Sequence, residues 1–217
     1  MSFINRILSG NVNHSHSSSE NINMKKILFA MLISICLLSC AGVRPEVIGV
    51  KPEPPVFIMG QGNVSAEKMA QFLLLNNSGF GSDNAQMISR LYMEEASFEG
   101  VNHDIAFIQM CLETGFLRYG GDVKPEQFNF AGLGAIGNGE PGLSFPDRRT
   151  GIRAHIQHLK AYGSREPLNL ELVNPRFRFV QRGRAPTYEG LAGTWAADPE
   201  YAVKINALLQ RLYDYAF

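Results

Sequence analysis

The sequence predicts a mostly helical domain with a small irregular or β-containing lobe. Three observations lead to this fold class. Apolar residues recur with helical spacing in several separate stretches. Most of these stretches begin at a residue that caps helices well or end at a glycine. The segment over residues 115–144 is rich in glycine and lacks the apolar alternation of long strands, although it can hold a small hairpin.

Two helices are expected at the start of the domain. Ser65 can cap a helix over residues 66–75, because a serine hydroxyl can accept a hydrogen bond from an amide of the first turn. A second stretch with helical periodicity covers residues 85–96. Gly100 is the expected stop, since glycine readily adopts the left-handed conformation that ends many helices.

The third helix begins at Asn102 or Asp104 and is apolar on nearly all sides, which is typical of a buried helix. Its polar strip after the first turn consists of Gln109 and Glu113, four residues apart. A carboxyl group beside a low-dielectric core has a raised pKa, so it can keep a proton near neutral pH and donate it to a leaving oxygen. A solvated glutamate on a partly exposed helix is the alternative, and the spacing alone does not exclude it.

Two more helices are expected after the glycine-rich segment. Asp147 or Thr150 can start a helix that runs to Tyr162 before a glycine. The last helix opens at residues 198–200, Asp-Pro-Glu, a capping residue followed by proline in the first turn, and continues through Leu209.

Residues 24–40, MKKILFAMLISICLLSC, contain two lysines, an apolar run and small residues at the end. This pattern is typical of a secretory signal and is too short for a comfortable transmembrane helix. Its end resembles the lipobox of bacterial lipoproteins, in which the cysteine is lipidated and becomes the mature N-terminus. We therefore expect a lipoprotein signal peptide over residues 24–39 and a membrane anchor at Cys40. An ordinary cleaved signal is the alternative.

The segments on either side of this signal carry little periodicity. Residues 1–23 are rich in serine, asparagine and histidine and precede a better start at Met24, which indicates a non-native upstream extension. Residues 40–64 contain four prolines and are expected to form an extended tether. The folded domain then covers residues 65–217.

The charge balance gives no indication of nucleic-acid binding. Lysine plus arginine and aspartate plus glutamate number 20 each, so a broad positive field is not expected. After processing, only Cys40 and Cys111 remain, which excludes a disulfide framework or a cysteine-based metal site. His155 and His158 share a helix face without an apparent third ligand. No metal or cofactor is expected, and no oligomeric state is assigned.

Four motifs resemble the endo-β-N-acetylglucosaminidase domain of bacterial cell-wall hydrolases. They follow one another within residues 82–215 and are ETGF at 113–116, NFAGLG at 129–134, FPDRRTGIRAHIQHLKAYGS at 145–164 and TWAADPEYAVKI at 194–205. The resemblance implies an α+β lysozyme-like fold, in which a helical lobe carries the acid and a cleft separates it from a small β-containing lobe. It also implies peptidoglycan as the substrate, cut at the β-1,4 bond after N-acetylglucosamine.

The resemblance makes Glu113 the expected general acid. Acetal hydrolysis needs a proton for the leaving oxygen and stabilisation of an oxocarbenium-like centre. Glu140, in the GNGEPG stretch, is a tentative second catalytic group that activates water, although it can equally be a solvated loop charge. Attack by the 2-acetamido group of the substrate is the other route to the second role.

Four aromatic residues are candidates for stacking on sugar rings, although each can also belong to the core. They are Phe130, Tyr162, Trp195 and Tyr201, and the resemblance adds Asn129 to the cleft. The closing motif of the family usually has tyrosine where this chain has Trp195. An indole can stack and donate a hydrogen bond but cannot accept one as a hydroxyl does.

We therefore expect a lipid-anchored peptidoglycan N-acetylglucosaminidase in the cell envelope, outside the cytoplasm. Its partners are glycan strands and, through Cys40, the membrane. One alternative is a muramidase or lytic transglycosylase on the same fold. Another is a non-catalytic peptidoglycan-binding lipoprotein.

Overall fold

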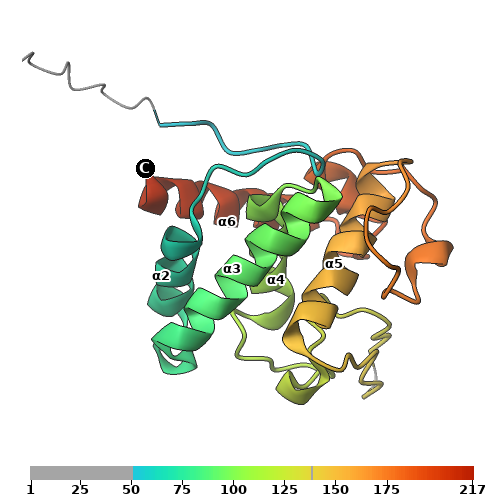
Figure 1. Ribbon diagram of the computed structural model, residues 1–217, viewed down its shortest axis with the longest axis horizontal. Coiled ribbons are helices and arrows are strands. Elements are labelled where there is room, and N and C mark those ends of the chain that lie inside the picture. The colour runs from blue at the N-terminus through green and yellow to red at the C-terminus, as the bar shows by residue number, and fades with distance from the viewer. Residues whose placement is uncertain (1–50, 138) are drawn as a thin grey trace, which may run out of the picture. The chain divides into compact units, whose positions relative to one another are not determined.

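The computed structural model describes residues 51–137 and 139–217, and the predicted signal peptide and Cys40 lie outside these ranges. The described chain is mostly helical, as predicted (Figure 1). No helix within these ranges is both long and apolar enough to cross a bilayer. The α-helices of the described residues are α2 (Ala66–Asn76), α3 (Ser82–Glu99), α4 (His103–Thr114), α5 (Arg148–Gly163) and α6 (Tyr201–Ala216).

Side-chain caps fix the starts of three helices, as the sequence predicts. The Ser65 hydroxyl accepts a hydrogen bond from the Lys68 amide at 3.3 Å. The Asn102 side chain accepts from two amides of the first turn of α4, the nearer at 3.0 Å. The Asp147 carboxylate accepts from the Thr150 amide at 2.9 Å. Each cap satisfies amides that have no partner within their own helix.

The last helix begins later than predicted. Asp198 accepts a hydrogen bond from the Glu200 amide at 2.9 Å, which closes a turn ahead of the helix. Helix α6 begins at Tyr201, and Glu200 gives it no side-chain cap. The Asp-Pro-Glu motif therefore directs the chain into α6 from a preceding turn.

Helix α4 lies in the core, which confirms the prediction of a buried helix. Every residue from His103 to Cys111 is buried. Helices α3, α5 and α6 all contact α4, and α2 packs against α3 and α6 (Figure 1). Apolar side chains from these helices form one continuous cluster that fixes the position of α4.

The predicted β-containing lobe is not formed as strands. Within residues 51–137 and 139–217, β pairing is limited to isolated bridges, and the predicted hairpin is reduced to the single bridge between Gly137 and Glu140. The physical reason is backbone conformation, because glycines with positive φ recur through this segment and interrupt the extended conformation. These glycines are Gly132, Gly134, Gly137, Gly139 and Gly142.

The end of the predicted tether belongs to the folded domain, so the predicted boundary at residue 65 is too late. Ile58 and Val64 are buried. The Ile58 carbonyl accepts from the Asn102 amide at 2.8 Å, and the Ile58 amide donates to the Pro186 carbonyl at 2.9 Å. Prolines keep this segment extended, but two of its apolar side chains complete the core. Isolated apolar residues without periodicity gave no signal for this burial.

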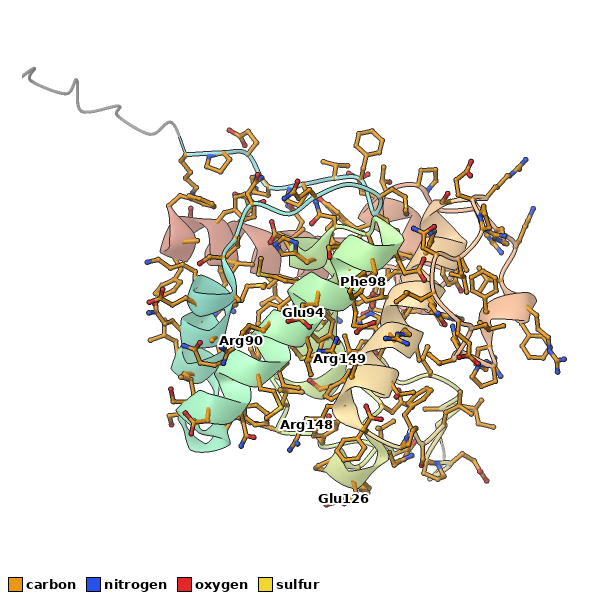
Figure 2. All side chains as sticks on the ribbon, in the orientation of Figure 1. Arg90, Glu94, Phe98, Glu126, Arg148 and Arg149 are labelled. Atoms are coloured by element: carbon orange, nitrogen blue, oxygen red, sulfur yellow. The ribbon has the colours of Figure 1, made fainter. Side chains whose placement is uncertain are left out.

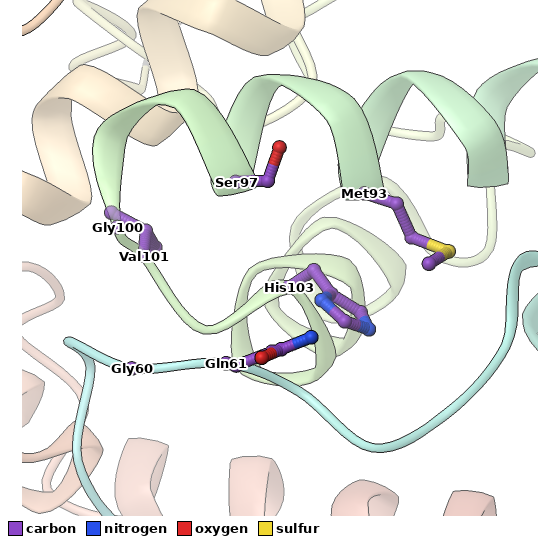
Figure 3. A pocket seen from close by; sticks show the side chains of 7 residues that line it. All are labelled: Gly60, Gln61, Met93, Ser97, Gly100, Val101 and His103. Atoms are coloured by element: carbon purple, nitrogen blue, oxygen red, sulfur yellow. The ribbon is translucent and has the colours of Figure 1, made fainter.

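The same segment closes a pocket near the start of α4. His103 contributes its imidazole and is held by a 3.0 Å hydrogen bond between Nε2 and the Val64 carbonyl. This pocket is lined by Gly60, Gln61, Met93, Ser97, Gly100, Val101 and His103 (Figure 3). Histidine is its only ionisable lining residue, so the pocket brings together no acid and base.

Ion pairs hold α5 against α3. Arg149 bonds Glu94 at 2.7 Å and Glu95 at 2.6 Å, and Figure 2 shows Arg149 on α5 beside Glu94 on α3. Arg153 bonds the other oxygen of Glu95 at 2.7 Å. The Glu95 side chain is fully buried, so the two guanidinium groups compensate a charge that would otherwise be costly. This contact sets the position of the face of α5 that carries His155.

Gly151 permits a close approach between α5 and the glycine-rich segment. A Cβ atom at this position would lie 1.8 Å from the carbonyl oxygen of Phe128. We expect Gly151→Ala to lower the free energy of unfolding by at least about 1–3 kcal/mol, because backbone must shift to admit the methyl group. Urea unfolding measures this change. Gly120→Ala is the matched control, since a Cβ there meets no atom within 4 Å, and equal stability of the two variants would contradict the prediction.

Candidate active site

Glu113 lies in the last turn of α4 and lines a pocket. Gly115 ends the helix with a left-handed φ of 58°, which turns the chain away directly after the glutamate. The opposite wall comes from the glycine-rich segment. The lining residues are Glu113, Thr114, Tyr119, Gly120, Gly121, Asp122, Val123, Asn129, Gly132 and Ala135.

The two carboxyl oxygens of Glu113 have different surroundings. Oε1 accepts hydrogen bonds from the Tyr201 hydroxyl at 2.5 Å and from Trp195 Nε1 at 2.9 Å. Oε2 lies toward the glycine-rich segment, where a Cβ atom at Gly132 would be 3.6 Å away. Burial raises the pKa of Glu113, and the two hydrogen bonds oppose this rise. Because both donors occupy Oε1, the proton of the neutral acid belongs on Oε2.

A chain of buried side chains lies behind Glu113. The Tyr201 hydroxyl accepts from Gln109 Nε2 at 2.8 Å, and Gln109 Oε1 lies 2.8 Å from His155 Nε2. His155 Nδ1 lies 2.9 Å from the Tyr92 hydroxyl. Burial, aided by the nearby His158, lowers the pKa of His155 to about 3, so its imidazole is neutral.

The directions of these bonds follow from the amide of Gln109. Its Oε1 accepts, so His155 carries its proton on Nε2 and accepts from Tyr92 at Nδ1. Its Nε2 donates to the Tyr201 oxygen, which leaves the Tyr201 proton to point at Glu113. Four helices therefore orient one hydroxyl toward one carboxyl oxygen.

Comparison with known families identifies the protein family that contains this site. The model of the family described as mannosyl-glycoprotein endo-beta-N-acetylglucosaminidase matches residues 89–214. That span covers more than half of the chain and contains Glu113, Trp195 and Tyr201. The chain belongs to the endo-β-N-acetylglucosaminidase family. Membership places the domain among the glycoside hydrolases.

A bacterial relative extends this similarity along the chain. An uncharacterized protein of Borreliella burgdorferi strain B31 is 38% identical over 197 residues. The alignment covers 88% of this chain and 97% of that protein. The covered share exceeds residues 89–214, so the similarity continues outside the glucosaminidase match.

Asn129 organises the loop that faces Glu113 in this glucosaminidase domain. It is fully buried, and its Oδ1 accepts from the Leu133 amide at 2.9 Å. Its Nδ2 donates to the carbonyls of Leu133 at 2.9 Å and Leu143 at 3.0 Å. These bonds hold Gly132 beside Glu113. Asn129 also lines the pocket, as predicted for a residue of the cleft, while its contact with substrate stays a prediction.

The predicted sugar-stacking residues differ in exposure and contacts. Phe130 is 4% exposed and packs edge-on against Tyr92, so it offers little ring surface to a sugar. Tyr201 is buried as well and uses its hydroxyl on Glu113. Tyr162 is partly buried, packs against Trp195, and donates to the Thr194 carbonyl at 2.9 Å. Stacking of these rings on a sugar stays a prediction.

Trp195 replaces the expected family tyrosine with a hydrogen-bond donor. The indole uses its N–H on Glu113, and its ring lies 5.0 Å from the His158 ring. Tyr201 donates its O–H to the same carboxyl oxygen. Oε1 of Glu113 therefore accepts from two donors.

The structure brings Asp122 to the pocket, which sequence reasoning missed. Asp122 lines the same pocket as Glu113 and accepts from the Gly139 amide at 3.2 Å. Glu140 is exposed and lies outside the lining residues, so its role as second catalytic group stays a prediction. Asp122 is a single aspartate in a glycine-rich segment. Its sequence context does not distinguish it from a charged side chain on a solvent-exposed loop.

His155 and Tyr92 were also missed as parts of the site. The spacing of His155 and His158 raised the question of a metal, yet no group of three potential ligands is found in the part of the chain that the structure describes. His155 instead bonds Gln109. Their distance in sequence is 46 residues, so no local pattern joins the two side chains.

The turn after Glu113 is strained. Phe116, Leu117 and Tyr119 have positive φ values of 59°, 60° and 50°, which are uncommon for residues other than glycine. Thr114 holds the turn, since its hydroxyl accepts from the Leu117 amide at 2.8 Å. The strained turn places the Tyr119 side chain in the pocket wall.

Proposed function

We propose that this domain hydrolyses the β-1,4 bond after N-acetylglucosamine in peptidoglycan, with Glu113 as the general acid. The observation that carries the proposal is the desolvated carboxyl at a pocket, with Oε1 occupied by two donors and Oε2 toward the pocket wall. A raised pKa keeps a larger fraction of this carboxyl protonated at a given pH. The family match supports a glycosidic substrate.

The chemistry assigns one step to each group. Glu113 Oε2 gives its proton to the glycosidic oxygen as the bond between that oxygen and the anomeric carbon breaks. Water supplies the oxygen that then bonds the anomeric carbon, and its proton is released. Tyr201 and Trp195 stabilise the carboxylate that remains on Glu113, because both donate to it.

The reaction also needs attack on the anomeric carbon, and two routes can supply it. In the first route Asp122, which lines the pocket, activates the water as a base. The 2-acetamido group of the substrate can attack the anomeric carbon instead. Proton NMR of the fresh product separates them, since inversion at the anomeric carbon requires the base and retention fits the acetamido route.

We also propose that Cys40 is lipidated and anchors the enzyme in the cell envelope, outside the cytoplasm. The lipobox-like end of residues 24–40 supports this. Labelling of cells with a radioactive fatty acid tests it. Label on the unmodified chain and none on Cys40→Ser is the expected result, and equal label on both would exclude lipidation at Cys40.

Mass spectrometry of peptidoglycan digested by the full chain tests the bond. Fragments that end in reducing N-acetylglucosamine are expected. Reducing N-acetylmuramic acid would identify a muramidase, and an anhydro product would identify a lytic transglycosylase. Retention on cell walls without products would identify a binding lipoprotein and overturn the proposed hydrolysis.

Tyr201→Phe is expected to shift the basic limb of the kcat/KM profile to higher pH. The acid acts in its protonated form, so activity falls as pH rises through the pKa of Glu113. Loss of the hydroxyl donor removes a hydrogen bond to the charged form and so raises the pKa of Glu113 further. Trp195 still donates to Glu113, and Asp122 and Tyr119 are the other ionisable residues that line the pocket.

Tyr188→Phe is the matched control for this shift. The Tyr188 hydroxyl donates to Asn206 Oδ1 at 3.1 Å and makes no bond to Glu113. Its profile should overlay that of the unmodified enzyme. An unmoved basic limb in Tyr201→Phe would show that the hydroxyl does not control the acid.

A further inference from the structure

A loop of unusual composition follows α5. Residues 174–184 read NPRFRFVQRGR and contain four arginines, two phenylalanines and no acidic residue. We call this segment the arginine loop. Its arginines are Arg176, Arg178, Arg182 and Arg184. The whole chain has equal numbers of acidic and basic residues, so this positive charge is concentrated locally.

Both ends of the arginine loop are fixed to α5. Gln157 Oε1 accepts from the amides of Val173 at 3.0 Å and Asn174 at 3.2 Å, and the Asn174 side chain lies 2.8 Å from His158 Nδ1. At the other end, the Gly183 amide donates to the Ala161 carbonyl at 2.9 Å. The loop is therefore held in place at both ends by buried or helical groups.

The tip of the loop presents an exposed aromatic ring between guanidinium groups. Phe179, in η3 (Phe177–Phe179), is 64% exposed. The Arg178 guanidinium lies 4.8 Å and that of Arg176 5.4 Å from the centre of its ring. Stacking orients the planar groups and leaves their N–H edges available. Across residues 51–137 and 139–217, neither arginine has a carboxylate partner within 4 Å.

The arginine loop lies beside the candidate active site. Its first residue, Asn174, bonds His158, whose ring contacts Trp195, and Trp195 donates to Glu113. Val173 packs with the glycine-rich segment and Trp195 in a common apolar cluster. Burial lowers the pKa of His158 to about 4, and the charge of Arg176 contributes to this shift.

We propose that the arginine loop binds the carboxylates of peptide stems on the glycan strand that occupies the Glu113 pocket. The proposal rests on the proposed function. Neutral sugars make no use of a concentrated positive charge, whereas guanidinium groups bind carboxylates through paired N–H donors. The exposed Phe179 ring gives apolar side chains of a stem a surface to pack on.

The position of the loop favours a stem peptide over a membrane surface. Lys51, where the described chain begins, pairs with Asp214 near the end of α6. In Figure 1, residues 177–179 lie at the opposite edge of the molecule from this end of α6. The loop therefore lies at the other edge of the domain from the end of α6 that Lys51 contacts.

Steady-state hydrolysis of soluble glycan strands by the full chain tests the proposal. One substrate carries intact stems, and the other has had its stems removed by an amidase, which leaves one lactyl carboxylate on each N-acetylmuramic acid but no stem carboxylate. We expect Arg176→Gln/Arg178→Gln to raise KM about tenfold on stem-bearing strands. Neither kcat nor the kinetics on stripped strands should change. Arg90→Gln/Arg211→Gln, with the same loss of charge on α3 and α6, should match the unmodified chain.

The outcomes separate failure of this proposal from failure of the proposed function. No cleavage of either substrate by the unmodified chain would overturn the hydrolysis. Sedimentation with both wall preparations, in the Glu113→Gln background, then still reports stem binding by the loop. Stem recognition would be overturned if the loop variant and the parent had the same KM or the same binding to cell walls. It would also be overturned if the variant lost equally on stem-bearing and on stripped strands. Loss of binding only to vesicles that contain phosphatidylglycerol would assign the loop to the membrane and also overturn it.

Discussion

Glu113→Gln is expected to lower kcat for glycan hydrolysis by about 10²- to 10⁴-fold. Glutamine keeps the shape of the side chain and an oxygen that accepts from Trp195 and Tyr201. Its amide group has no acidic proton for the leaving oxygen, so the loss is chemical. Release of new reducing ends from peptidoglycan by the full chain measures the change. Glu67→Gln, on the surface of α2, is the matched control and should retain full activity.

Stability measurements distinguish this chemical loss from unfolding. Burial raises the folded-state pKa of Glu113. The stabilisation linked to its proton is therefore complete below the unfolded pKa and is lost as pH rises through the folded pKa. Glutamine does not titrate, so Glu113→Gln should be as stable as the parent or more stable at neutral pH. Full activity of Glu113→Gln, or an unfolded variant, would contradict the assignment of Glu113 as an acid.

Lys160→Met is expected to lower the free energy of unfolding by about 3–5 kcal/mol. Lys160 Nζ lies 2.8 Å from Glu99 Oε2, and the two side chains are 3% and 0% exposed. Glu99 also accepts from the amides of Asn169 at 2.9 Å and Leu170 at 3.1 Å. Removal of the lysine leaves a buried carboxylate with two neutral donors, whereas the methionine preserves most of the apolar stem. Urea unfolding measures the loss.

A double variant tests whether the uncompensated charge causes this loss. Lys160→Met/Glu99→Gln removes both charges and should recover much of the stability of the single variant, because no buried ion remains without a partner. If the double variant is less stable than Lys160→Met, then lost packing explains the effect. The ion pair joins the end of α3 to α5, so its loss also weakens the contact that positions His155 behind the acid.

Part of the candidate site follows from local sequence. The apolar spacing around Glu113 predicts a buried helix with a single polar strip, and Gln109 belongs to that strip as expected. The motif order over residues 82–215 indicates the family that the comparison shows. Asn129 lines the pocket, while its contact with substrate stays a prediction. The helix prediction is confirmed because helical period is a property of neighbouring residues, and the family prediction is confirmed because its motifs are short local stretches.

Other features of the site required the folded chain. Trp195 and Tyr201 are 82 and 88 residues from Glu113, yet both donate to Oε1. Asp122 lines the pocket although Glu140 was the expected second carboxylate. The β-containing form of the predicted small lobe was not confirmed within the described residues, where β pairing is limited to isolated bridges. Left-handed glycines interrupt strands there without leaving a sign in apolar spacing.

The sequence by itself determined the helices, their caps at Ser65, Asn102 and Asp147, and the glutamate on the buried helix. Only the tertiary structure decided that Trp195 and Tyr201 both donate to Oε1 of Glu113 and that Oε2 lies toward Gly132. Helix periodicity and capping are local properties that a window of residues encodes. A hydrogen bond between distant elements depends on how whole helices pack, and no local pattern records that geometry.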